Sequence, residues 1–270
     1  MRQLVVSLAL VLSACGAPKE PAKPAEHVAT VAAPEPDSET DDKTAPGSAP
    51  ERDGSGAEGC TAGLRSASDL GAAGEERVLY DAGLAAERGG DAPTARKTYF
   101  ELIQKHPTSK LIPLAYLAFG ELFSVEAESD PTKWELAKAS YREVIKYPPP
   151  DNVAYFYALL RLGAADRGDP SQALSDFAKA SEVTKLHPSS PCASAIADQA
   201  REGMVRAFAE AGAPDKAWAF FRAKLGEREG ADAMRSLVRS YRGAGKKNEA
   251  CAAAKGASNL PELGKEGCAP

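Results

Sequence analysis

A short turn-like pattern recurs along the chain from about residue 74 onward, and it limits what this part of the protein can fold into. Each copy begins with a glycine, carries Asp, Pro or Lys within the next two residues, and reaches an alanine five residues after the glycine. The copies are residues 90–95, 168–173, 212–217 and 245–250. Between them, apolar residues return every three or four positions, as on one face of an amphipathic helix. We therefore expect pairs of helices, A and B, joined by turns of one kind.

Each position of this pattern has a physical role. The glycine is expected to end helix A in a left-handed conformation that other residues avoid. An Asp or Pro after it is expected to start helix B, as a cap or through its fixed φ. The alanine lets helix B lie close to helix A. An aromatic residue four positions later, Tyr99, Phe177 or Phe221 in three of the copies, fills the space between the helices.

The pattern resembles the tetratricopeptide repeat, a helix–turn–helix unit of about 34 residues. Ala82 and Gly83 match the family's small pair on helix A, whereas the family's helix-A tryptophan is missing throughout and Ala254 replaces the last aromatic. The resemblance covers about residues 74–260. It implies an all-α fold, a right-handed α-solenoid of about four to five helix pairs in which each unit buries a face against its neighbours. The alternative is an irregular helical bundle, against which the Gly-to-Ala spacing argues.

The same periodicity predicts ten helices, with extra residues near 126–132 and 185–194. The expected helices are residues 75–88, 93–105, 112–125, 131–146, 153–167, 170–184, 194–210, 214–225, 230–242 and 248–257. Residues 261–270 are expected to form a C-terminal tail.

The N-terminus has the features of a signal peptide that ends at a cysteine. Arg2 precedes a short apolar run at residues 4–12, and the small residues Ser13 and Ala14 precede Cys15. The run is too short to span a bilayer as a permanent helix. It resembles the lipobox of bacterial lipoproteins, which implies removal of residues 1–14 and lipidation of Cys15. The alternative is a plain signal peptide with a chance cysteine. Gly16, in place of the Asp that favours inner-membrane retention in some families, points to the outer membrane.

Residues 15–60 are expected to form a disordered, lipid-anchored linker. Residues 17–58 are rich in Pro, Ala, Glu, Asp, Gly and Ser, and apart from alanine their aliphatic side chains are Val28 and Val31. Such a segment cannot bury enough apolar surface to offset its chain entropy. Residues 16–60 hold ten acidic and four basic residues, whereas residues 61–270 are neutral with 28 of each. Without a basic face in the folded part, no nucleic-acid partner is expected.

Four cysteines remain after Cys15, an even number for an oxidising compartment. Cys251 and Cys268 are nearest in sequence, and their pairing would join the tail to the last helix. Cys60 with Cys192 would tie the end of the linker to the repeats. Spacing alone leaves open that some of the thiols stay free. No Cys-x-x-Cys occurs, so a zinc site is not expected.

The chain lacks a recognisable catalytic constellation, so we expect no enzyme activity, no cofactor and no metal. Its three histidines are His27 in the linker, and His106 and His187 each before a proline at an expected helix end. A lipid-anchored scaffold of the cell envelope that binds protein or peptide partners is the favoured interpretation. The alternatives are a small-ligand-binding lipoprotein and a cell-wall-associated accessory protein.

The resemblance to tetratricopeptide repeats implies that partners bind in a concave groove lined by the A helices. Aligned on the turn glycines, Tyr80, Leu84 and Glu87 face this groove in the first unit, and Tyr155 in the third. Arg206 lies in the fourth unit, and the fifth carries three arginines on one helical face, Arg235, Arg239 and Arg242. A guanidinium cluster suits an acidic segment of a partner. The alternative is a polar, solvated cap of the kind that a terminal repeat needs.

Overall fold

The computed structural model describes residues 64–65, 71–166, 168–188, 190 and 192–269. All regular structure in these residues is helical, and they contain no strand, which confirms the predicted all-α fold. The predicted signal peptide, residues 1–14, and all of the linker at residues 15–60, including Cys15 and Cys60, lie outside the described residues.

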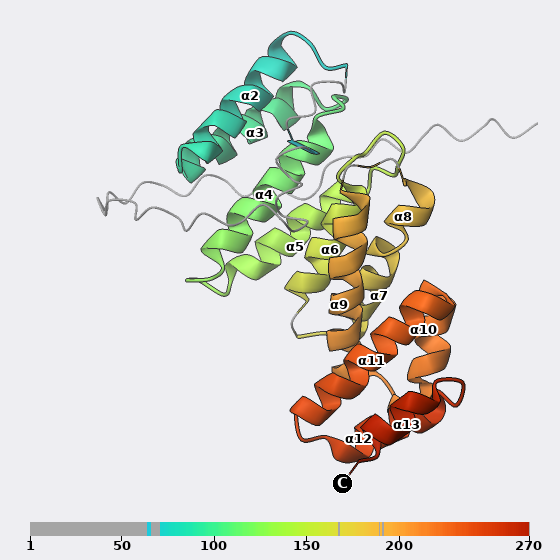
Figure 1. Cartoon of the computed structure of the whole chain (residues 1–270). Coiled ribbons are helices and arrows are strands. Elements are labelled where there is room, and N and C mark those ends of the chain that lie inside the picture. The colour runs from blue at the N-terminus through green and yellow to red at the C-terminus, as the bar shows by residue number, and fades with distance from the viewer. Residues whose placement is uncertain (1–63, 66–70, 167, 189, 191, 270) are drawn as a thin grey trace, which may run out of the picture. The chain divides into compact units, whose positions relative to one another are not determined.

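The described helices form five consecutive A/B pairs, a short helix between the third and fourth pairs, and a final short helix (Figure 1). In chain order they are α2 (Glu75–Arg88), α3 (Ala92–Lys105), α4 (Ile112–Glu126), α5 (Lys133–Val144), α6 (Tyr155–Ala165), α7 (Pro170–Ala180), α8 (Val183–Leu186), α9 (Ala193–Ala211), the 3-10 helix η1 (Pro214–Lys216), α10 (Ala217–Leu225), α11 (Glu227–Gly243), α12 (Lys247–Gly256) and α13 (Pro261–Gly267).

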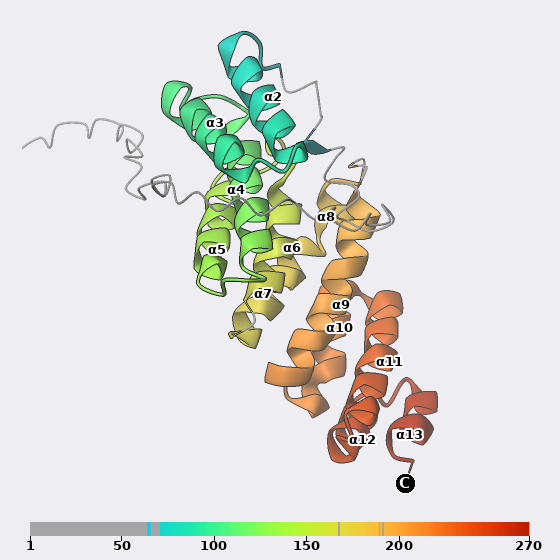
Figure 2. The same cartoon turned by 90° about the vertical axis from the view of Figure 1, so that its left-hand side faces the viewer.

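Each helix packs against its neighbours in the series, as in a TPR-like α-solenoid. Contacts run from α2 through α3, α4, α5 and α6 to α7, then from α7 to α9 and from α9 to α11. Helices α10 and α12 both pack on α11, and α13 packs on α11 and α12. Figures 1 and 2 show the helices following one another in this order. No described helix is long and apolar enough to cross a membrane.

Two of the B helices start with the aspartate caps that the sequence predicted. The side chain of Asp91 accepts a hydrogen bond from the backbone N–H of Thr94 at 3.0 Å, and that of Asp169 accepts one from Gln172 at 3.0 Å. Each cap satisfies an N–H that the first turn of a helix leaves without a partner. The Asp-Pro and Asp-Ala-Pro sequences therefore act as helix starts.

The prediction of a left-handed glycine at each turn is confirmed at two of the four positions. Gly90 and Gly245 have φ of 78° and 75°, whereas Gly168 is not among the glycines with positive φ and Gly212 is extended at φ −83° and ψ 155°. The prediction was wrong at these two turns. At Gly212 a Cβ would lie 2.5 Å from ring atoms of Phe208, so glycine is required there by close packing.

A glycine in helix A lies under the aromatic ring of helix B in each of the first three units. Tyr99 covers Gly83, Tyr141 covers Gly120, and Phe177 covers Gly163, each so closely that a Cβ on the glycine would collide with ring carbons. The same ring of Phe177 also leaves no room for a Cβ at Gly203 of α9. These contacts set how closely the paired helices approach.

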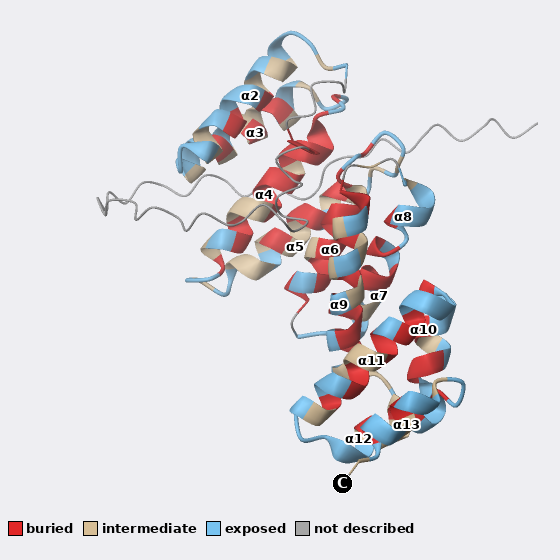
Figure 3. Ribbon diagram, in the orientation of Figure 1, coloured by how far each residue is buried: buried red, intermediate tan, exposed pale blue. Residues whose placement is uncertain are grey.

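Burial follows the faces where helices meet (Figure 3). Helices α4 and α6 are the most extensively buried, with ten of 15 and eight of 11 residues inside, while α2 and α12 have exposed outer faces. The largest fully buried side chains include several tyrosines, Tyr80, Tyr99, Tyr141, Tyr157 and Tyr241. Buried tyrosines usually need hydrogen-bond partners for their hydroxyls, and the hydroxyls of Tyr80, Tyr99 and Tyr141 each donate a hydrogen bond.

Two helices were not predicted. Helix α8 begins at the end of the predicted helix 170–184 and runs into the extra residues near 185–194, so the predicted helix is in fact divided between α7 and α8. Helix α13 lies in the predicted tail, where Leu263 is fully buried and Gly267 would place a Cβ 2.6 Å from that of Ala254. Ala254 stands where the other three copies of the turn pattern carry an aromatic residue, and α13 packs against it.

Candidate functional site

A tyrosine, a glutamate and an arginine meet where the second unit contacts the third. The hydroxyl of Tyr141 on α5 donates to Glu121 Oε1 on α4 at 2.7 Å. Arg161 Nε on α6 lies 2.9 Å from the same carboxylate and 3.3 Å from the tyrosine oxygen. Burial is the largest single influence and lowers the pKa of the Arg161 guanidinium, but Glu121, Tyr141 and Tyr157 together outweigh it, so the pKa is above its ordinary value. The three side chains thus connect both helices of one unit to helix A of the next.

The first unit has the same three side-chain types, but its arginine comes from outside the repeats. The hydroxyl of Tyr99 on α3 donates to Glu87 Oε2 on α2 at 3.1 Å. Both terminal nitrogens of Arg65 bind the Glu87 carboxylate, and Nη2 also donates to the Tyr99 oxygen at 3.1 Å. Arg65 precedes the first repeat, so a segment N-terminal to the repeats is held on the first helix pair.

A comparison of α6 with α4 shows why the arginine in the first unit comes from outside the repeats. Arg161 lies two residues before Gly163, the glycine beneath the ring of Phe177. On α4 the residue two positions before the corresponding glycine, Gly120, is Ala118. Helix α4 therefore carries no guanidinium at the matching position, and Arg65 supplies one to the first unit.

The Arg65 site is buried and strongly polarised. Arg65 is 7 % exposed, and the side chain of Glu87 is 18 % exposed. Burial is the largest single influence and lowers the pKa of the Arg65 guanidinium, but the hydrogen bond to Glu87 and the charges of Glu87, Tyr99 and Tyr80 together outweigh it. The pKa is therefore above its ordinary value. Burial also raises the pKa of both Tyr80 and Tyr99, which keeps their hydroxyls protonated and able to donate. Tyr80 uses its hydroxyl to bind the backbone carbonyl of Arg65 at 3.0 Å.

Leu64, the neighbour of Arg65, is 5 % exposed and forms part of the wall of an apolar pocket of ≈ 290 Å³. The rest of the lining comes from the loop before α6, the start of α6, α8 and the start of α9. These residues are Pro150, Asn152, Val153, Phe156, Val183, His187, Ser190 and Ile196. Leu64 and Arg65 therefore contact two parts of the repeat series. Leu64 lies at the junction of the third and fourth units, and Arg65 lies on the first helix pair.

The structure places the predicted groove residues of the first and third units as follows. Tyr80 and Leu84 are buried, and Glu87 faces Arg65 instead of solvent. Tyr155 is half-buried as the first residue of α6, with its ring 5.2 Å from that of Phe156. In the run Tyr155-Phe156-Tyr157 it is Phe156 that lines the pocket, where its ring lies 5.5 Å from the ring of His187.

The predicted arginine face divides into bound and exposed members. Arg235 pairs with Asp232 at 2.7 Å and with Glu262 of α13 at 3.5 Å, and Arg242 donates to the carbonyl oxygen of Ala269 at 2.8 Å. Arg206 on α9 and Arg239 on α11 are exposed, and within the described residues neither makes a hydrogen bond or an ion pair. The C-terminal helix and tail thus engage two of the three arginines that were predicted to share one face of α11.

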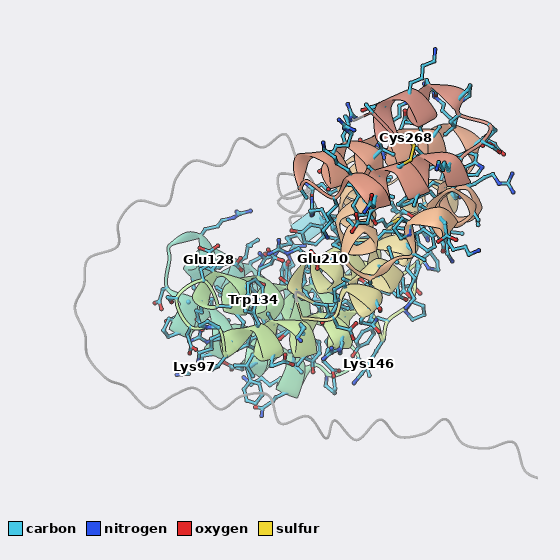
Figure 4. All side chains as sticks on the ribbon, turned by 90° about the horizontal axis from the view of Figure 1, so that it is seen from below. Lys97, Glu128, Trp134, Lys146, Glu210 and Cys268 are labelled. Atoms are coloured by element: carbon cyan, nitrogen blue, oxygen red, sulfur yellow. A yellow bond between two sulfur atoms is a disulfide. The ribbon has the colours of Figure 1, made fainter. Side chains whose placement is uncertain are left out.

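The C-terminal cysteines are joined. Cys251 of α12 and Cys268, directly after α13, form a disulfide with their Cα atoms 4.4 Å apart, which Figure 4 shows beside the Cys268 label. Cys192 is buried at the start of α9. Its predicted partner Cys60 lies outside the described residues.

The described residues contain no group of His, Cys, Asp and Glu arranged to hold a metal ion. His106 and His187 follow the last residues of α3 and α8, as predicted for helix ends. Sequence reasoning missed Arg65 and Leu64. A lone glycine inside a helical pattern often has a packing reason, and this signal could have located Gly120 and Gly163, but no local signal marked Arg65.

Comparison with known proteins supports the repeat assignment. Residues 77–109 match the family model of the tetratricopeptide repeat. No curated protein and no solved structure matches the chain. The chain thus contains a TPR repeat, which spans α2 and α3 and includes Glu87 and Tyr99. TPR repeats are in general non-catalytic modules that bind protein partners through extended surfaces.

Proposed function

We propose that this chain is a lipid-anchored scaffold of the cell envelope that binds protein or peptide partners through the A-helix surface of its repeats. The observation that supports this most directly is the TPR repeat at residues 77–109, at the start of a continuous series of helix pairs. Stacked repeats present long surfaces that suit extended partners. An α-solenoid also folds without cofactors, so nothing in this role requires a reaction centre.

The anchoring part of the proposal rests on the lipobox-like residues 12–15. Lipid on Cys15 would hold the chain at a membrane, for which the outer membrane is the proposed site, and two or more acyl chains would make the attachment stable. The linker at residues 15–60 would hold the repeats away from the bilayer, with a reach of about 35–40 Å. Metabolic labelling with a palmitate analogue should mark the unmodified chain and not Cys15→Ser. Equal labelling of both would exclude lipidation at Cys15.

The fourth and fifth units carry the proposed contact for an acidic partner segment. Arg206 and Arg239 have exposed guanidinium groups, which suit carboxylates because the planar fork binds both oxygens. Arg235 and Arg242 would contribute only after release from Glu262 and Ala269. Tyr155 would provide a half-buried aromatic surface at the third unit.

In-cell crosslinking of the lipidated chain followed by mass spectrometry tests the proposal. Specific envelope proteins should crosslink, and they should be lost in the variant Arg206→Glu/Arg239→Glu. Lys97→Glu is the matched control, because Lys97 is an exposed base on helix α3, away from these units (Figure 4). If partners persist in the double variant, the arginines form a solvated cap. If no protein crosslinks specifically to any form, the scaffold role is wrong.

A small-molecule role has weaker support. The apolar pocket beside Leu64, at ≈ 290 Å³, is at the lower limit of the range of about 300–1,000 Å³ that is typical of small-molecule sites. Its wall also includes a residue of the N-terminal segment, which points to a role in binding polypeptide.

A further inference from the structure

The pair Leu64-Arg65 is bound to the repeats in the way that a peptide ligand would be bound. The carboxylate of Glu87 binds the guanidinium through two oxygens, Tyr99 binds it from the side, and Tyr80 binds the backbone carbonyl. The aliphatic side chain of Leu64 is buried at the apolar pocket. One acidic subsite, one backbone contact and one apolar subsite together recognise an aliphatic residue followed by arginine.

The acidic subsite requires a guanidinium that the repeats themselves do not provide. In the second unit, Arg161 of the neighbouring helix A neutralises the Tyr141–Glu121 pair. In the first unit, the matching position of α4 is Ala118, so the Tyr99–Glu87 pair depends on an arginine from outside the series of helices. Without that arginine a half-buried carboxylate would lose its partner, which is costly in a site of low polarity.

In the described part of the occupying segment, two side chains make the buried contacts. Among the described residues before α2, Leu64 and Arg65 are the two that are buried, whereas Gly71, Ala73 and Gly74 are exposed. Another segment of the same chemistry can replace Leu64 and Arg65, because these two residues are held at the site by hydrogen bonds, an ion pair and apolar packing. The segment competes from within the chain at a high effective concentration, so an outside ligand binds weakly until the segment is released.

We infer that Glu87, Tyr80, Tyr99 and the pocket around Phe156 form a binding site for a partner segment in which an aliphatic residue precedes arginine, and that Leu64-Arg65 occupies this site in cis. The inference rests on the proposed scaffold function and names a partner chemistry for its first unit. This chemistry is opposite in charge to that proposed for Arg206 and Arg239, so the two ends of the repeat series would select different parts of a partner.

Binding of a fluorescent peptide with the sequence of residues 61–68, Thr-Ala-Gly-Leu-Arg-Ser-Ala-Ser, tests the site in the full chain. Because Arg65→Gln removes the competing guanidinium, we expect this variant to bind the peptide about 10–100-fold more tightly than the unmodified chain does. Peptides with Ala for Leu, or Gln for Arg, should bind the variant at least about tenfold more weakly. The inference is overturned if a folded Arg65→Gln chain does not bind the peptide, or binds these three peptides with equal affinity.

Glu87→Gln in the Arg65→Gln background should abolish peptide binding. Glu76→Gln is the matched control, because Glu76 lies on the same helix and makes no hydrogen bond or ion pair within the described residues. If both double variants bind equally, Glu87 is not the subsite. Circular dichroism confirms that each variant is folded.

A measurement on the unmodified chain covers the case in which the Arg65 variant does not fold. Millimolar peptide should raise amide hydrogen exchange at Leu64 and Arg65 by displacing them, while exchange in α11 and α12 stays constant. Protection of α2 shows when the peptide has saturated the Glu87 site. If amide exchange at Leu64 and Arg65 is still unchanged at that peptide concentration, the inference is overturned. Dimers of the unmodified chain that need Arg65 would assign the site to a second copy and so overturn the partner assignment.

The outcomes separate this inference from the proposed function. If the peptide does not bind while envelope proteins still crosslink, only the inference fails. If the peptide binds as expected and no envelope protein crosslinks, the Glu87 site exists and the scaffold role in the envelope fails.

Discussion

Arg161 on α6 and Glu121 on α4 are ion-paired across the junction of the second and third units, with Nε and Oε1 2.9 Å apart. The hydroxyl of Tyr141 bonds to both groups, and Ser124 Oγ lies 2.9 Å from the same hydroxyl. The side chains of Arg161 and Glu121 are 20 % and 23 % exposed, so water screens the pair only in part. This network joins three helices and is therefore expected to stabilise the stacking of one unit on the next.

Glu121→Gln should lower the free energy of unfolding by about 1.5–3 kcal/mol, because Arg161 loses a charge-assisted hydrogen bond while it stays largely buried. Urea unfolding followed by circular dichroism measures the change. Glu128→Gln, at an exposed carboxylate after α4, should change it by less than about 0.5 kcal/mol (Figure 4). Equal effects of the two substitutions would show that the network contributes nothing specific.

Gly120→Ala should destabilise the protein by about 1–3 kcal/mol, because the new methyl group collides with the ring of Tyr141. Gly243→Ala is the control. Gly243 is also helical, but a Cβ there meets nothing within 4 Å, so the helix should gain about 0.4–1 kcal/mol. Thermal unfolding of both variants gives the sign of each change. Stabilisation by both substitutions would contradict the close approach of the ring.

Reduction of the Cys251–Cys268 bond should loosen the C-terminal end of the repeats. The bond closes a loop with a sequence separation of 17 residues, for which chain entropy predicts about 3 kcal/mol of stabilisation. Because repeat units depend mainly on their neighbours, amide exchange should rise in α12 and α13 while α2 to α5 stay protected. In a Cys251→Ser/Cys268→Ser chain, reductant should not change amide exchange in α12 and α13. A uniform rise along the whole chain would instead show that the repeats unfold as one unit.

Asp166→Asn should stabilise the protein at neutral pH. Asp166 is 5 % exposed, and burial raises the pKa of its carboxyl above the ordinary value of 3.8, with Lys138, 3.4 Å away, opposing this effect. Since the folded chain holds this proton more tightly than the unfolded chain, folding loses stability as the pH rises from 3.8 through the folded-state pKa. The amide does not titrate, so its advantage should grow over that interval and stay constant above it.

Urea unfolding of the Asp166→Asn chain and the unmodified chain at pH 3, 5 and 7 measures this advantage. Asp198→Asn, an exposed carboxylate paired with Arg201, serves as the control. An advantage of Asp166→Asn that shrinks as the pH rises would mean that Lys138 stabilises the carboxylate more than burial penalises it.

Cys60 and Cys192 should be joined in the oxidised protein. Leu64 lines the same pocket as Ser190 and Ile196, which lie on either side of Cys192 in the sequence. Cys60 precedes Leu64 by four residues, a span of at most about 14 Å, so its sulfur can reach this region. Digestion without reductant should yield the linked peptides. Alkylation of both thiols in the unreduced chain would disprove the pairing. It would also mean that no disulfide at Cys60 links the segment that carries Leu64 and Arg65 to the repeats.

Local patterns predicted the helices well where both their ends carried local signals. Helix α2 was predicted to the residue, since its apolar face lies between Gly74 and Gly89, and the capped starts at Asp91 and Asp169 were also found. The errors occurred where contacts with other helices decide whether a segment is helical. Helix α13 is stabilised by the contacts of Leu263 and Gly267 with other helices, and no periodic pattern in seven residues could have shown that.

The candidate site was predicted only in part. The alignment on turn glycines placed Tyr80 and Glu87 on the inner face of α2, and both take part in the site. The same alignment gathered Arg235, Arg239 and Arg242 on one face of α11, but it could not show that α13 and the tail engage two of them. A face can be deduced from the period of one helix, whereas what covers that face depends on another segment.

The amino-acid sequence alone determined the helical class, the repeat period, the turn positions and the caps, because each depends on residues within about one helical turn of one another. Tertiary structure decided which charges meet. Arg65 and Glu87 are 22 residues apart, and Glu121 and Arg161 are brought together from different units. Such pairs form only when helices stack in one register, since stacking sets which side chains face each other and removes them from water.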